Sequence, residues 1–107
     1  MKKFFGGIFM NRDNLKEVGI NYPIKLEYYK IINDEIIKEG NARYGINVVK
    51  TAYIGEKVKV ENKLIKYLSD NEKRVEYILD RFKENEVTPN AVKDVLGDLL
   101  NKLVLIQ

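Results

Sequence analysis

The sequence contains no cysteine and no histidine, and these two absences exclude most catalytic and metal-binding chemistry. Without cysteine there are no disulfides, no thiolate nucleophiles and no cysteine-ligated zinc or iron–sulfur sites. Without histidine there is no imidazole metal ligand, no Ser-His or Cys-His pair and no histidine general base. Acid–base chemistry would have to run on Asp, Glu, Lys, Tyr and Arg alone. We therefore expect a protein that is not an enzyme, with no catalytic residue and no cofactor.

The sequence also lacks the short motifs that hold metals or phosphates. It contains no EF-hand spacing, and its early Gly-Gly pair belongs to neither a P-loop nor a dinucleotide fingerprint. Glu72 and Glu76, like Asp94 and Asp98, are spaced four residues apart, as on one side of a helix. Acidic pairs on a polar helix face are usually just solvated, so we expect no Mg²⁺ or Ca²⁺ site.

What is present is the composition of one globular domain. The chain has 107 residues, of which 45% are apolar and 33% are charged. Its first ten residues, MKKFFGGIFM, imitate the start of a signal peptide, but the apolar run is short and glycines interrupt it. We expect a frayed end there, or a segment that docks on its own fold or on a partner. The lack of cysteine suits a reducing compartment, and we predict a cytoplasmic protein without a membrane span.

Strand-like patterns occupy the first two thirds of the chain. Apolar and polar residues alternate in IKLEY at residues 24–28, as in a half-buried strand, and a later Asn-Asp pair predicts a turn into EIIKE. Residues 35–54 are consistent either with two strands or with one long strand bulged near Gly40 or Gly45. The two readings stay open at this point.

A hairpin is predicted where a Gly-Glu pair separates TAYI from KVKVENKLIKYL. In the second of these segments Val58, Val60 and Leu64 share one face, and Lys57 and Lys59 lie on the other with further charged residues. This pattern favours an antiparallel meander.

Two helices are predicted after the strands. Ser69 and Glu72 form a capping box, and apolar residues then recur at helical spacing until the helix ends near Asn85. Thr88 and Pro89 begin a second helix, because proline is favoured at the first helical position. The apolar stripes are Val75, Ile78, Leu79 and Phe82 in the first helix and Val92, Val95, Leu96, Leu99, Leu100 and Leu103 in the second.

Together these patterns predict an α+β fold, in which an antiparallel three- or four-stranded meander precedes a C-terminal α-helical hairpin packed on one sheet face. A single domain would span residues 1–107, with an N-terminal segment at 1–22, the meander at 23–68 and the hairpin at 69–106. The helix pair has the outline of a DNA-reading helix-turn-helix. However, residues 69–107 carry six basic and eight acidic groups, so we expect the pair to cover the sheet instead.

The first 68 residues have the opposite character, with thirteen basic and eight acidic groups and six of the seven tyrosines. Aromatic side chains on a basic sheet can stack the bases of single-stranded nucleic acids. The alternative is structural, because tyrosine is a favoured strand residue and strand lysines solubilise a sheet and protect its edges. The residues that would form the nucleic-acid surface are Tyr28, Tyr29, Arg43, Lys57 and Lys59.

A candidate protein-interaction site lies on the first predicted helix. Tyr77 is expected opposite the apolar face, flanked by Arg74 and Arg81, and such a cluster is typical of interface hot spots. Stacking of the tyrosine ring on a guanidinium, without any partner, is the alternative. At Gly45 a bulge would let Arg43 hold a carboxylate or phosphate, although a surface ion pair explains the same residues.

These observations favour a non-enzymatic protein-interaction or regulatory module. The apolar ends FFGGIFM and LVLI and free sheet edges support self-association as a homodimer. Single-stranded nucleic-acid binding is the alternative function, and an inhibitor of a host protein, toxin-like or phage-encoded, is compatible with the small size. No small-molecule substrate is evident.

The segments RYGINVVK and EKVKVENK, followed by NEVTPNAVKDVLGDLL, resemble a small family of unknown function from Firmicutes, chiefly clostridia. Its members are similar in length and share a Tyr-Gly-Ile strand and a final helix that starts with Thr-Pro or Ser-Pro. The resemblance covers residues 24–100 and leaves the N-terminal segment out. It implies a bacterial, cytoplasmic setting and no activity, cofactor or catalytic residue.

Overall fold

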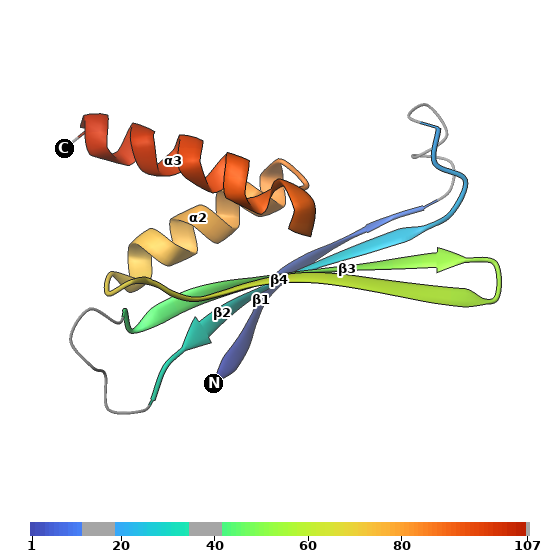
Figure 1. The fold of residues 1–107 in the computed structure, drawn as a ribbon, viewed down its shortest axis with the longest axis horizontal. Coiled ribbons are helices and arrows are strands. Elements are labelled where there is room, and N and C mark those ends of the chain that lie inside the picture. Colours follow the sequence, from blue (N-terminus) through green and yellow to red (C-terminus); the bar gives the residue numbers. More distant parts are fainter. Residues whose placement is uncertain (12–18, 35–41, 107) are drawn as a thin grey trace.

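The computed structural model describes residues 1–11, 19–34 and 42–106, with side chains described as far as Asn101. In this part of the chain an antiparallel sheet with strand order β1-β2-β3-β4 precedes two helices (Figure 1). The elements are β1 (Lys2–Met10), β2 (Ile24–Ile32), β3 (Tyr44–Ile54), β4 (Lys57–Ser69), α2 (Glu72–Glu84), the 3-10 turn η2 (Pro89–Ala91) and α3 (Val92–Ile106). The predicted α+β fold, a meander followed by a helical hairpin on one sheet face, is confirmed.

Strand β1 comes from the N-terminal segment, in which the sequence indicated no strand. It pairs antiparallel with β2 along its whole length. The register shifts between Phe4 and Gly6, so one extra residue breaks the regular alternation that identifies a strand in a sequence. The meander therefore begins at Lys2, whereas the sequence predicted a start at Pro23.

The region between β2 and β3 is described only in part. Strand β3 is continuous from Tyr44 to Ile54, whereas the strand expected at EIIKE lies outside the described residues. Of the two positions considered for a bulge, Gly45 has one, because the register of β3 against β4 shifts between Tyr44 and Ile46. The backbone of β4 passes so close to Gly45 that a Cβ atom there would overlap the carbonyl oxygens of Ile65 and Lys66. Only glycine fits this position.

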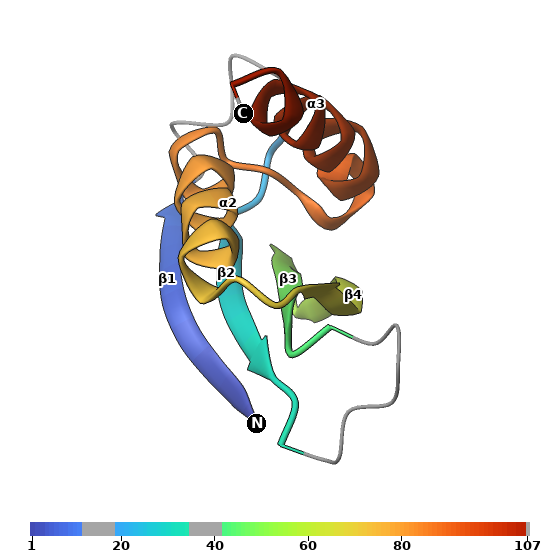
Figure 2. The same cartoon turned by 90° about the vertical axis from the view of Figure 1, so that its left-hand side faces the viewer.

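Helix α2 lies against the sheet and α3 lies farther from it, so both helices are on one side (Figures 1 and 2). The four apolar residues predicted for α2 are buried, and in α3 Val92, Leu96 and Leu99 are buried while Leu100 is exposed. From the sheet and the connection between the helices the core receives Ile24, Leu26, Tyr28, Ile46, Val48 and Val87. The hydroxyl of Tyr28 donates a hydrogen bond to the backbone oxygen of Val87 at 2.8 Å, which joins β2 to the connection.

Both helix starts differ from the sequence prediction. Pro89–Ala91 form a 3-10 turn, in which Thr88 makes no side-chain cap hydrogen bond, and α3 begins at Val92. The N-cap of α2 is Asn71 and not Ser69: the Asn71 side chain accepts a hydrogen bond from the backbone N–H of Arg74 at 3.1 Å. Ser69 is the last residue of β4, and its hydroxyl oxygen accepts from the Asn71 N–H. Because β4 includes Ser69, the helix starts two residues later than the capping box predicts. The end of α2 before Asn85 is confirmed.

The close approach at Gly45 predicts opposite outcomes for two identical substitutions. Gly45→Ala should lower the free energy of unfolding by about 2–3 kcal/mol, because the new methyl group overlaps the backbone of β4. Gly97→Ala, on α3 where nothing lies within 4 Å of the new Cβ, should raise it by about 1 kcal/mol through helix propensity. Urea unfolding followed by circular dichroism measures both. Equal effects would contradict the predicted contact at Gly45.

Candidate functional site

The side of the sheet away from the helices, here called the open face, is the largest surface that the fold leaves uncovered on the sheet (Figure 2). The strand register defines which side chains share it, because residues directly opposite each other on paired strands lie on one face. One row across the four strands is Phe4, Tyr29, Asn47 and Leu64, and another is Phe9, Lys25, Thr51 and Val60.

Five large apolar side chains on the open face are more than half exposed. This open-face patch consists of Phe4 (57% exposed), Phe9 (62%), Val58 (60%), Val60 (58%) and Leu64 (53%). The rings of Phe4 and Tyr29 meet edge to face at 5.6 Å between centroids, and those of Phe9 and Tyr53 lie 6.3 Å apart. The patch therefore joins the two edge strands across aromatic residues of the central strands, and it is larger than scattered apolar exposure.

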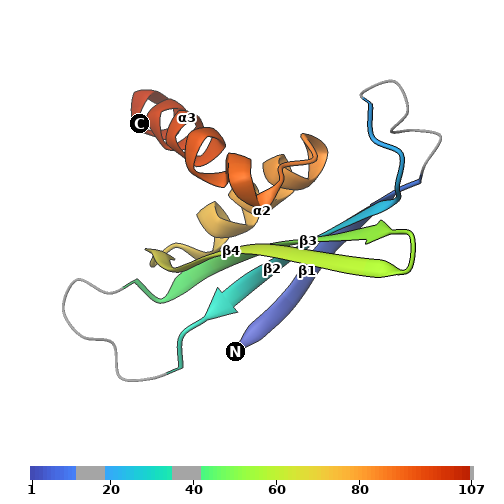
Figure 3. The same ribbon diagram turned by 45° about the vertical axis from the view of Figure 1, so that its right-hand side comes forward.

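Between Lys57 and Leu64, β4 directs its valines and Leu64 to the open face and its lysines to the helix side. Lys59 lies opposite Ala52, which is buried with the core, whereas Val60 lies opposite Thr51 on the open face. The β3–β4 hairpin extends beyond the helices, so that neither face of its far end is covered (Figure 3). The alternation predicted for β4 is real, but its apolar face does not contribute to the core.

The charged groups of the open face have partners on the same face. The ammonium of Lys2 lies 4.1 Å from the centroid of the Tyr29 ring. Lys25 and Glu27 form an ion pair at 3.6 Å, and Glu27 accepts a hydrogen bond from the Tyr29 hydroxyl at 2.7 Å. Glu27 raises the pKa of Lys25, and its hydrogen bond raises the pKa of Tyr29. The Lys25–Glu27 pair is thus neutral as a pair, whereas Lys2 keeps its positive charge beside the Tyr29 ring.

The five residues predicted to bind nucleic acid do not share one surface. Tyr28 is fully buried on the helix side, where its ring cannot stack on a base, while Tyr29 lies on the open face. Lys57 and Lys59 project to the helix side of the hairpin. Arg43 is exposed and precedes β3, and its backbone N–H donates to the Asp70 carboxylate at 2.9 Å. Successive side chains of a strand point to opposite faces of the sheet, so the adjacent Tyr28 and Tyr29 cannot lie on the same face.

The predicted Arg–Tyr cluster lies along the exposed side of α2. Tyr77 is 48% exposed, and Arg81 forms an ion pair with Glu84 at 2.7 Å. In the described part of the chain the contacts of a cation with an aromatic ring are those of Lys2 with Tyr29 and of Lys66 with Tyr67. Arg74 and Arg81 therefore do not stack on Tyr77, and the cluster is an accessible polar surface.

An ion-pair cluster that the sequence did not indicate joins the sheet to α2. Lys30 is only 7% exposed at its side chain, and its ammonium lies 3.0 Å from a Glu72 oxygen and 3.2 Å from a Glu76 oxygen. Burial by itself would lower the pKa of Lys30, but the hydrogen bonds to the two carboxylates raise it. The carboxylate pair that we considered for a metal thus holds a lysine. The spacing Ile24, Leu26, Tyr28, Lys30 places this lysine on the helix side.

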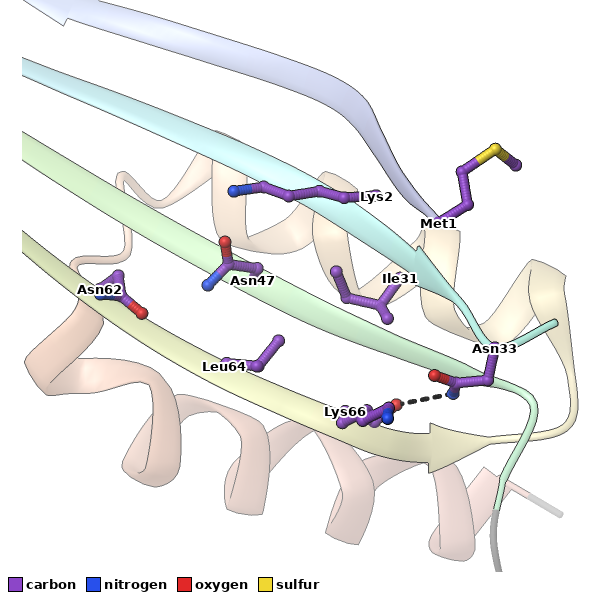
Figure 4. A pocket seen from close by; sticks show the side chains of 8 residues that line it. All are labelled: Met1, Lys2, Ile31, Asn33, Asn47, Asn62, Leu64 and Lys66. Carbon is purple, nitrogen blue, oxygen red and sulfur yellow. Dashed lines mark hydrogen bonds between the residues drawn. The ribbon is translucent and has the colours of Figure 1, made fainter. Parts of the chain in front are cut away.

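A shallow hollow of about 490 Å³ lies at the end of the open face where β1 begins and β4 ends. It is lined by Met1, Lys2, Ile31, Asn33, Asn47, Asn62, Leu64 and Lys66 (Figure 4). Two of these residues, Asn33 and Asn47, are buried polar side chains. Sequence periodicity could not indicate the hollow, because its lining comes from all four strands and a hollow depends on their register.

Removal of both carboxylates from the ion-pair cluster should destabilise the protein more than the two single changes together. Either glutamate alone still pairs with Lys30, so Glu72→Gln and Glu76→Gln should each cost under about 1 kcal/mol, and the double variant about 2 kcal/mol. Glu84→Gln, which breaks an exposed pair, is the control and should cost less than about 0.5 kcal/mol. Adding Lys30→Met to the double variant should restore most of the loss. Strictly additive single effects would argue against the shared lysine.

Tyr28 should make the stability fall in alkaline solution. Burial, and then the nearby Glu86 carboxylate, raise the pKa of Tyr28 from its usual 10.0. The contribution of this pKa difference to the free energy of unfolding is complete below pH 10. It is lost as pH rises towards the folded-state pKa, because in that range Tyr28 ionises only in the unfolded chain. Tyr28→Phe should lower the free energy of unfolding by about 1 kcal/mol at pH 7 and weaken its decrease in alkaline solution. The control Tyr77→Phe, at an exposed tyrosine, should have neither effect. Urea unfolding at several pH values tests this.

The described residues contain no group of three or more acidic side chains that could hold a metal ion. Within the same residues, no helix has both the length and the apolar character needed to cross a membrane.

Comparison with known proteins places the chain in a family. No curated protein and no solved structure matches it. A family model described as a family of unknown function, DUF6514, matches residues 9–102, which include β2, β3, β4, α2 and most of α3. The match thus covers the sheet and helix pair that create the open face, apart from most of β1. The chain belongs to the DUF6514 family.

Proposed function

We propose that the protein is a non-enzymatic protein-interaction module, and that it forms a homodimer through the open face of its sheet. The observation that carries this proposal is the orientation of β4, whose Val58 and Val60 face solvent on a side that no helix covers. A strand at a sheet edge normally directs its lysines to water and its valines to the core. Here the apolar side is left for a partner.

A second copy of the chain is the partner that the open face fits best. Two sheets stack about 10 Å apart when both inner faces are apolar, and a two-fold axis would place each copy's open-face patch on the other's. The Lys25–Glu27 pair is compatible with this arrangement, because it adds no net charge to either of the two identical faces. The cytoplasmic setting expected from the lack of cysteine is part of the same proposal.

The exposed area is compatible with a dimer interface. With about 150–250 Å² for a whole phenylalanine, Phe4 and Phe9 together leave roughly 200–300 Å² accessible. A stable interface buries about 800 Å² on each partner. Val58, Val60 and Leu64 and the half-buried side chains between them, among them Tyr29 and Tyr53, would supply the remainder.

Single-stranded nucleic-acid binding is kept as the second candidate function, on a different surface from the one expected. Lys57, Lys59 and Lys63 share the helix side of the β3–β4 hairpin, and only Glu61 lies between them. Lys59 pairs with Glu61 at 3.3 Å, which weakens the case. Such binding would involve the lysines of the hairpin without the aromatic residues of the open face.

Two matched pairs of substitutions on β4 test both candidates. Val58→Glu with Val60→Glu places two carboxylates on the open face and should convert a dimer to a monomer, with an affinity loss of at least about a hundredfold. Lys57→Glu with Lys59→Glu places the same side chains on the opposite face of the same strand and should leave the dimer intact. Size-exclusion chromatography with light scattering gives the mass, and absorbance at 260 and 280 nm reports bound nucleic acid.

Each result decides something. A wild-type protein that is monomeric at high concentration, or a dimer that survives the valine changes, contradicts the proposed interface. Co-eluting nucleic acid that is lost with the lysine changes and at high salt would support the second candidate instead.

A further inference from the structure

We propose that the hollow at the β1 end of the open face binds the C-terminal residue of a peptide, that is, an N-acylated amino acid with a free carboxylate. The hollow shares Leu64 with the open-face patch, but Phe9, Val58 and Val60 occupy the opposite end of the face. The inference therefore goes beyond the proposed dimer and can be tested separately from it.

Two buried asparagines supply fixed hydrogen-bond acceptors. Asn33 is 3% exposed, and its amide nitrogen donates to the backbone oxygen of Lys66 at 3.0 Å and to those of Ala42 and Arg43 at 3.1 Å. Asn47 is 6% exposed, and its amide nitrogen donates to the backbone oxygen of Lys63 at 3.0 Å. With each nitrogen held by a neighbouring strand, the orientation of each amide is determined.

The side-chain oxygens of the two asparagines remain available. Among the described residues neither oxygen accepts a hydrogen bond, and neither is a fully enclosed atom without a partner. Figure 4 shows the Asn33 nitrogen bonded to Lys66 and the oxygens of Asn33 and Asn47 directed away from β4. A ligand that bonds to either oxygen must carry an N–H or O–H donor, since a carboxamide oxygen only accepts.

The other lining groups define the remaining features of the ligand. Lys2 lies at the β1 side of the hollow with its ammonium over the Tyr29 ring, which holds a positive charge where an anion can approach. Ile31, opposite Lys2, and Leu64, opposite Asn47, provide apolar surface in the hollow. The ligand thus needs a hydrogen-bond donor such as an amide N–H, an anionic group and an apolar side chain. A leucine-like residue at the C-terminus of a peptide has all three.

The test uses N-acetyl-leucine as the probe, added to the full chain labelled with ¹⁵N. We expect saturable shifts of the Asn33 and Asn47 side-chain NH₂ signals, with a dissociation constant on the order of 1–10 mM. Two analogues each lack one feature: 4-methylpentanoate lacks the N–H and N-acetyl-leucinamide lacks the carboxylate. Both should bind about tenfold more weakly. Gly-Gly-Leu should bind at least as well as the probe, and free leucine, whose ammonium would approach Lys2, should bind less well.

A pair of variants locates the anion contact. Lys2→Gln should weaken N-acetyl-leucine about tenfold and leave N-acetyl-leucinamide unchanged. Lys3→Gln is the matched control, because the neighbouring side chain lies on the other face of β1, and it should have no effect. The proposal is overturned if the asparagine signals do not shift, if both truncated analogues bind as well as the probe, if free leucine binds best, or if Lys3→Gln is equally damaging. Binding retained in Val58→Glu/Val60→Glu would show that the hollow works without the dimer.

Discussion

The whole structure depends on a simple geometric constraint: side chains alternate between the two faces of a sheet, and one helical layer can cover only one of them. Helix α2 lies against the sheet and α3 lies beyond it, so among the described elements none covers the opposite side. Every strand therefore divides its residues between a core and a surface. On β4 this division leaves Val58 and Val60 exposed, and the open-face patch is the direct consequence.

The helix side is held by polar contacts as well as by apolar packing. The Tyr28 hydroxyl joins β2 to the connection between the helices, and Lys30 joins the same strand to two carboxylates of α2. Buried polar groups are costly unless they are paired, so these contacts favour a single docking position for the helix pair. Because the helix pair docks in one position, it always leaves the same side of the sheet uncovered. Both proposed binding surfaces lie on this open face.

Much of the fold could be predicted from the sequence, and the reasons differ between elements. Helix α2 was recognisable because four apolar residues recur at helical spacing, and Gly45 because glycine inside a strand pattern marks a bulge. Strand β1 could not be recognised in the sequence, since its bulge between Phe4 and Gly6 removes the alternation of apolar and polar residues. The Lys30 cluster was not predicted either, because it joins residues more than forty positions apart.

The sequence by itself determined the absence of histidine and cysteine chemistry, the α+β class, and which residues of a strand lie on the same face as one another. Alternation specifies only this relative sorting: it separates Tyr28 from Tyr29 and Val58 from Lys59, but it does not say which set meets the helices. Only the tertiary structure decided that, through the docking of α2 and the register of four strands. The hollow with its two asparagines arises in the same way, because its lining residues become neighbours only when β1 to β4 are paired.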